Sequence, residues 1–152
     1  MKALGATVAL LVAASAAAAA DEPGTFATAE RGSLKVVSGV MLTPRGGVMK
    51  GVWLDRTLSC RVRRRLRVTV QIDLVRPSGA TSRVRQSKTG LVDNCAEGGP
   101  TFGFEPTARM LGLGCADGRW RPGRYAMTTT TTHLASGLRA SATLYRHVTR
   151  RC

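Results

Sequence analysis

Residues 60–74, CRVRRRLRVTVQIDL, alternate between two kinds of side chain. The even positions from Cys60 to Leu74 are apolar except for Arg64, whereas the odd positions carry arginine, threonine, glutamine and aspartate. A period of two residues is that of a β-strand with one face buried and the other in solvent. The segment therefore predicts one long strand with Cys60 on the buried face. Its length exceeds that of most strands, so we expect a bulge or break near residues 63–65.

The same period recurs elsewhere in the chain. It is found in residues 34–42, 102–104 and 138–148, and the threonine-rich residues 124–133 favour a strand through β-branching. Glycine and proline pairs that favour turns separate these segments. After the first twenty residues no apolar helical pattern persists for three turns. Short strands without intervening helices predict an all-β fold, a single antiparallel sandwich of about seven strands.

The first residues have the pattern of a targeting segment. A lysine at position 2 is followed by an apolar run that ends in small residues before Asp21, which is typical of a secretory signal peptide. An uncleaved membrane anchor is the alternative, because about 18 apolar residues can span a bilayer. We expect a signal peptide over residues 1–20, a loose polar leader over 21–31 and one secreted domain over 32–152, with no further membrane segment.

Four cysteines follow the signal segment, Cys60, Cys95, Cys115 and Cys152. No CxxC pair is present and no cysteine lies close to a histidine, so a zinc site is not indicated. An even number of cysteines in an exported chain favours two disulfides. Three pairings are possible from the sequence, and the pairing Cys60–Cys95 with Cys115–Cys152 is the one we favour.

One short motif resembles a known family. Residues 120–128, WRPGRYAMT, resemble the turn that enters the penultimate strand of bacterial immunoglobulin-like and fibronectin type III-like domains. The matching residues are Trp120, Pro122, Gly123 and Tyr125. The resemblance implies an immunoglobulin-like sandwich in which the tyrosine hydroxyl bonds to nearby backbone and fixes a corner between strands. Met127 stands where antibody-type domains carry a cysteine, so the disulfides would not cross the core as in antibodies.

The strongest candidate for function is an arginine row, which we define as Arg61, Arg63, Arg65 and Arg67. These side chains share the solvent face of the predicted strand in a chain of net charge +14. Arginine binds phosphate, sulfate and carboxylate in a bidentate manner. The row therefore predicts a binding module for an anionic cell-envelope polymer, lipid headgroups or an acidic protein. Nucleic acid is not favoured, because aromatic side chains for base stacking are absent from the row.

The arginine row also has two interpretations that involve no ligand. Like charges on an edge strand prevent edge-to-edge aggregation, and a compositional bias of the genome can also enrich arginine. Residues Arg83, Arg85 and Lys88 would extend the row if their segment forms a hairpin with residues 60–76.

Catalytic residues are not apparent. The histidines, His133 and His147, both occupy odd strand positions that we expect to face solvent, and no GxSxG motif is present. We therefore expect a non-enzymatic protein without metal or cofactor. The alternative is a secreted serine protease inhibitor, because bacterial subtilisin inhibitors are also exported, β-rich and doubly disulfide-bonded. Residues 56–60, RTLSC, resemble the strand before their first cysteine, and Met110-Leu111 is the candidate reactive loop, although Cys60 and Cys95 lie farther apart than the inhibitors' first two cysteines.

Overall fold

The computed structural model of the chain describes residues 24–55, 62–93 and 101–152. These residues form eight β-strands and no α-helix. In chain order the strands are β1 (Thr25–Arg31), β2 (Leu34–Leu42), β3 (Gly47–Asp55), β4 (Arg63–Val75), β5 (Thr81–Asp93), β6 (Thr101–Phe104), β7 (Gly123–His133) and β8 (Arg139–Val148). Within the described residues, no helix could cross a membrane.

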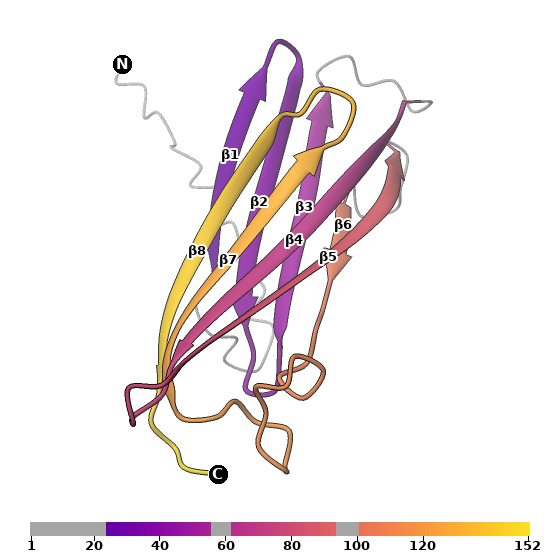
Figure 1. Cartoon of the computed structure of the whole chain (residues 1–152). Coiled ribbons are helices and arrows are strands. Elements are labelled where there is room, and N and C mark those ends of the chain that lie inside the picture. Colours follow the sequence, from indigo (N-terminus) through magenta and orange to yellow (C-terminus); the bar gives the residue numbers. More distant parts are fainter. Residues whose placement is uncertain (1–23, 56–61, 94–100) are drawn as a thin grey trace, which may run out of the picture.

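The strands form two four-stranded sheets that pack as two layers (Figure 1). The first sheet has the order β1-β2-β3-β6 and the second sheet has the order β5-β4-β7-β8. Every pair of neighbouring strands is antiparallel. The prediction of an all-β, antiparallel, sandwich-like fold is confirmed, with eight described strands where about seven were expected.

The core lies between the two sheets. The even positions of β4 from Leu66 to Leu74 are fully or almost fully buried, as their alternation predicts. Those from Val68 to Leu74 pack in one cluster with buried side chains of the first sheet, among them Val40 and Met49, and with Met127 of β7. Leu66 packs in a second cluster with Trp53 and Val92. Burying an apolar side chain of this size contributes about 1.5–3 kcal/mol relative to leaving it exposed. The inward face of β4 is therefore a main source of the fold's stability.

The first strand lies in the segment that we expected to be a loose leader. Residues 25–31 form β1, which pairs with β2 along its whole length from Thr25↔Val40 to Arg31↔Leu34. The sequence signal is weak because two of its half-buried positions, Ala27 and Ala29, are small. Its one large apolar side chain, Phe26, is 63% exposed. The expected leader over 21–31 is therefore corrected for residues 25–31, which belong to the domain.

The expected bulge near residues 63–65 does not occur in β4. The ladder between β4 and β5 runs without interruption from Arg63↔Asp93 to Val75↔Thr81. Arg64 therefore points inward, where its guanidinium forms an ion pair with Asp55, with 3.5 Å between Nη2 and Oδ2. It also lies 5.8 Å from the centre of the Trp53 ring. Because Asp55 and Trp53 contact the inward side chain of Arg64, the strand stays regular without a bulge that would turn Arg64 to solvent.

The four matching residues of the WRPGRYAMT motif lie where the chain enters β7: Trp120 and Pro122 precede the strand, and Gly123 and Tyr125 belong to its first residues. The Tyr125 hydroxyl donates a hydrogen bond of 2.7 Å to the backbone oxygen of Arg121, which is the contact that the resemblance implies. Trp120 donates from Nε1 to the Thr43 backbone oxygen at 3.0 Å, and its ring meets that of Tyr125 edge-on. The Trp120–Thr43 bond attaches the long connection before β7 to the turn between β2 and β3.

One disulfide joins Cys115 and Cys152, whose Cα atoms are 5.4 Å apart. This bond is part of the pairing favoured from the sequence. It closes a loop with a sequence separation of 37 residues, and a bridge of this kind contributes about 2–4 kcal/mol to stability. Cys60 and Cys95 lie outside the described residues.

Candidate anion-binding face

Three members of the arginine row lie on the outer face of the second sheet. Arg63, Arg65 and Arg67 are exposed at the odd positions of β4, opposite the buried even positions. Same-face neighbours on a strand are about 6.6–7 Å apart. Arg61 lies outside the described residues, so the described part of the row consists of three arginines at evenly spaced positions along the strand.

The row does not lie on an edge strand. β4 is an interior strand that pairs with β5 on one side and with β7 on the other. Like charges protect sheets from aggregation when they lie on an unpaired edge. β7 pairs with β4 only from Leu66 onward, so the strand is paired on both sides at Arg67, whereas Arg63 and Arg65 pair with β5 alone. Edge protection therefore does not account for Arg67.

The neighbouring strands add a fourth cation. Arg67 lies opposite Thr132 of β7, and Thr132 lies opposite Arg139 of β8. Adjacent strands are about 4.7–4.9 Å apart, so the Cα atoms of Arg67 and Arg139 are separated by about 9–10 Å. On the other side of the row, Asp93 lies opposite Arg63 and reduces the positive charge at that end. The positive centre of the face is therefore formed by Arg65, Arg67 and Arg139.

The hairpin of β4 and β5 brings further cations to the opposite end of this face. Arg83 forms an ion pair with Asp73, and the hydrogen bond from Arg83, followed by one from Gln71, lowers the pKa of the Asp73 carboxyl. Arg85 lies opposite Gln71 on the same face. Lys88 lies on the opposite face of β5 from Arg83 and Arg85, on the inward side of the strand. Its Nζ atom is 5.6 Å from the centre of the Phe102 ring. Of the three expected additions, only Arg85 adds charge that is not matched by Asp73.

A hydroxyl band separates the two cationic ends of the outer face. We use this name for six side chains that hydrogen-bond in pairs across neighbouring strands. The pairs are Thr69 with Ser87 at 2.9 Å, Thr130 with Ser141 at 2.8 Å, and Thr128 with Thr143 at 3.0 Å. Because the band is uncharged and polar, it offers hydrogen bonds without repelling an anionic ligand.

The histidines do not lie together. His147 is exposed, but His133 is buried, which corrects the expectation that it faces solvent. Burial lowers the pKa of His133, and the charge of Arg64 lowers it further. His147 lies opposite Arg124 near the start of β7, whereas His133 ends that strand. Within the described ranges, no three histidine, cysteine or acidic side chains are grouped so that they could hold a metal ion.

The candidate inhibitor loop has a compact conformation. Met110 is 64% exposed, but the next residue, Leu111, is buried in the core cluster. The Leu111 backbone nitrogen donates to the Thr107 oxygen at 3.2 Å, which folds the segment into a tight turn. A segment that imitates a protease substrate has to present several side chains in an extended form. The geometry of this loop therefore does not favour the inhibitor alternative, and residues 56–60 lie outside the described residues.

Comparison of the chain with protein-family models, curated proteins and solved structures gives no match. The assignment of a site consequently depends on geometry and charge. Within the positive centre, Arg139 is the residue that sequence patterns did not single out. Its parity in residues 138–148, opposite to the apolar positions, indicates an outward side chain, but only the pairing of β8 with β7 places it beside the row.

Proposed function

We propose that the protein is a non-catalytic binding module that holds an anionic cell-envelope polymer on the outer face of its second sheet. The observation that carries this proposal is the exposure of Arg63, Arg65 and Arg67 on an interior strand. Arg67 lies where the strand is paired on both sides, so edge protection gives no reason for this arginine. The row also contributes nothing to the buried side of β4, and a ligand is the use that we propose for it.

The spacing of the cations supports a polymer as the ligand. Three guanidinium groups along β4, together with Arg139 two strands away, match a chain that carries repeated phosphate or carboxylate groups. The hydroxyl band beside them supplies hydrogen-bond partners for the sugar or polyol units between such charges. An acidic protein would use the same charges but would not need the band.

Export is part of the same proposal. The signal-peptide pattern of residues 1–20 would deliver the domain to the cell envelope or beyond it. The Cys115–Cys152 disulfide supports this location, because disulfides persist in oxidising compartments outside the cytosol.

We also propose that the fold is of the immunoglobulin-like class. Immunoglobulin domains place strands B and E in one sheet and strands C, F and G in the other, with an added C′ in variable-type domains. If β3 and β6 correspond to B and E, and β4, β7 and β8 to C, F and G, the observed order β5-β4-β7-β8 follows with β5 as C′. The Tyr125 corner at the start of β7 is in the position expected for strand F.

A binding experiment with charge-matched variants tests the function. Arg63→Ser/Arg65→Ser/Arg67→Ser removes three positive charges from the face. The control Arg45→Ser/Lys50→Ser/Arg109→Ser removes three charges from exposed positions on the β2–β3 turn, the first sheet and the loop before β7. Cosedimentation of the mature proteins with purified cell walls at low ionic strength gives the affinities.

We expect the variant of the row to bind about 3- to 150-fold more weakly than the wild type, because each of three surface charge contacts is worth about 0.2–1 kcal/mol. The control should lose much less. Equal losses in both variants would show that binding depends on net charge alone and would refute the proposed face. If the row variant fails to bind an acidic protein but still binds walls, the polymer is the wrong ligand class.

A further inference from the structure

A second candidate site lies at the end of the sandwich, where β8 stops and the C-terminal residues begin. A cavity of about 290 Å³ opens there, between the β2–β3 turn, the loop before β7 and residues 146–151. Part of its lining is apolar, including Trp120 and Val148. Trp120 is held in place by its hydrogen bond to Thr43 and by its edge-on contact with Tyr125, so it forms a rigid wall. A volume near the lower end of ligand-site volumes suits a small molecule.

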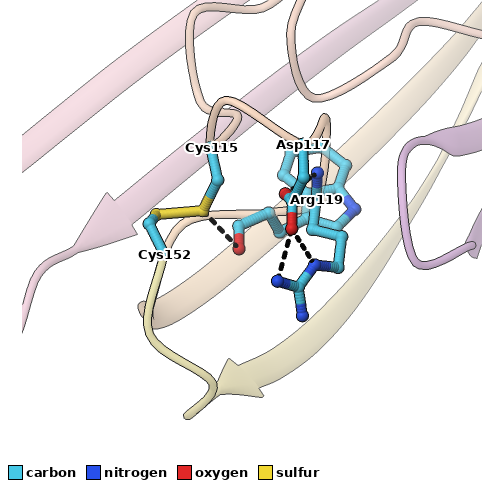
Figure 2. A network of polar contacts seen from close by, with 5 residues as sticks. Cys115, Asp117, Arg119 and Cys152 are labelled. Atoms are coloured by element: carbon cyan, nitrogen blue, oxygen red, sulfur yellow. Dashed lines mark hydrogen bonds and ion pairs between the residues drawn. A yellow bond between two sulfur atoms is a disulfide. The ribbon is translucent and has the colours of Figure 1, made fainter.

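The rest of the lining is strongly cationic. Four arginines contribute to it, Arg119, Arg146, Arg150 and Arg151, and none of the described residues that line the cavity is acidic. Asp117 lies nearby, but it is engaged by Arg119 through an ion pair and by the Arg119 backbone nitrogen at 3.0 Å (Figure 2). The cationic side of the cavity therefore has one carboxylate close to it and several guanidinium groups around it.

The Cys115–Cys152 disulfide assembles this cavity. The last strand ends at Val148, so Arg150 and Arg151 belong to a segment without secondary structure. Cys152 immediately follows them, and its bond to Cys115 fixes the segment beside the loop that carries Asp117 and Arg119 (Figure 2). Cys115 itself lines the cavity, and its Sγ lies 3.7 Å from the Trp120 backbone oxygen. The disulfide thus brings the cationic segment to the aromatic wall.

We propose that this cavity binds a small amphipathic anion, an organic phosphate, sulfate or carboxylate with an apolar group, and that the Cys115–Cys152 disulfide is required for binding. The anionic group lies between Arg150 and Arg151, whose guanidinium groups bind an oxyanion in a bidentate manner, because Arg119 is engaged by Asp117. The apolar group packs against Trp120 and Val148. This site is separate from the arginine row and does not depend on the function proposed for it.

Calorimetric titration with phenyl phosphate tests the site, with inorganic phosphate and benzyl alcohol as probes of each half of the ligand. Two variants remove two charges each: Arg150→Ser/Arg151→Ser at the cavity and Arg63→Ser/Arg65→Ser on the outer face. A third variant, Cys115→Ser/Cys152→Ser, removes the disulfide without leaving a free thiol, and its circular dichroism spectrum reports whether the sheets are retained.

Wild-type protein should bind phenyl phosphate saturably and about tenfold or more tightly than either half-probe. The Arg150/Arg151 variant should bind it about tenfold more weakly, because two charge-assisted contacts are lost. The outer-face variant should bind like the wild type, and the folded cysteine variant should lose binding. The proposal is overturned by the absence of saturable binding, by equal losses in both arginine variants, by equally tight binding of inorganic phosphate, or by full binding without the disulfide. If the cysteine variant does not fold, the two arginine variants decide whether the cavity binds the anion.

Discussion

The Arg64 guanidinium on β4 forms an ion pair with Asp55 on β3, across the space between the two sheets. Its neighbours along the chain, Arg63 and Arg65, point to solvent from the opposite side of the same strand. One run of three arginines is thus divided by the strand's period into a structural residue and two surface residues. The division gives separate expectations for stability and for binding.

Replacing Arg64 with leucine should destabilise the fold more than replacing Arg65 with serine. Asp55 is almost fully buried, and removing Arg64 takes away a charged partner, which costs about 1–3 kcal/mol in the free energy of unfolding. Arg65→Ser is a surface change and should stay within about 0.5 kcal/mol of the wild type. Urea unfolding of the two variants measures both values. Equal destabilisation would contradict a contribution of the inward ion pair to the free energy of unfolding.

Tyr125→Phe should weaken the fold at neutral pH and remove a loss of stability at alkaline pH. The variant leaves the Arg121 backbone oxygen without its hydrogen bond, which costs about 1–2 kcal/mol. Desolvation raises the pKa of Tyr125 from 10.0 to about 12. Between these values the unfolded chain loses the phenol proton and the folded chain keeps it, so the free energy of unfolding falls as pH rises. The phenylalanine variant lacks this group, and thermal unfolding from pH 9 to about 11.5 should show a flatter dependence.

His133→Gln should reduce the loss of stability in mild acid. The pKa of His133 is lowered below 6.5 by desolvation and by Arg64. As the pH falls below about 6.5, the unfolded chain binds a proton that the folded chain does not bind, and the free energy of unfolding decreases. The glutamine variant lacks this contribution. Melting temperatures between about pH 5 and 8 compare it with the wild type, and the same slope in both proteins would contradict the assignment.

Gly51→Ala should destabilise the sandwich, whereas Gly103→Ala should not. A Cβ atom at Gly51 would lie 2.7 Å from Thr131 Cγ2 and 2.8 Å from Val68 Cγ2, both on fully buried side chains of the second sheet. Overpacking of this kind costs about 1–3 kcal/mol. At Gly103, on the neighbouring strand β6, a Cβ atom would meet no atom within 4 Å. Chemical denaturation of both variants therefore reports how closely the two sheets approach at β3.

Strict alternation explains which strands could be predicted from the sequence. In β4 the two faces differ clearly in polarity, so the strand and its buried side follow directly. β3 was not singled out, because Val52 and Leu54 on its outer face are also apolar and obscure the period. In β7 threonines occupy both faces, with Thr129 and Thr131 buried, so the phase of the strand and the burial of His133 could not be read.

The candidate face could be predicted only in part. Parity alone places Arg63, Arg65 and Arg67 on the solvent side of one strand. Whether that strand lies at an edge, and which side chains lie beside it, depends on pairing between segments far apart in the sequence. The interior position of β4 and the approach of Arg139 to Arg67 are both consequences of the order β5-β4-β7-β8. The cavity beside the C-terminal residues likewise depends on long-range contacts that a single sequence does not contain.

The most direct test of the proposed face is to locate a bound polyanion on the protein by nuclear magnetic resonance. Uniformly 15N-labelled mature protein is titrated with a soluble polyol phosphate polymer, and amide shifts are followed at low and at high salt. We expect the largest changes at residues 63–67 of β4, at Thr132 and at Arg139, and we expect them to disappear as salt screens the charges. Changes that are spread over all cationic positions, or centred on the first sheet, would contradict the proposed face.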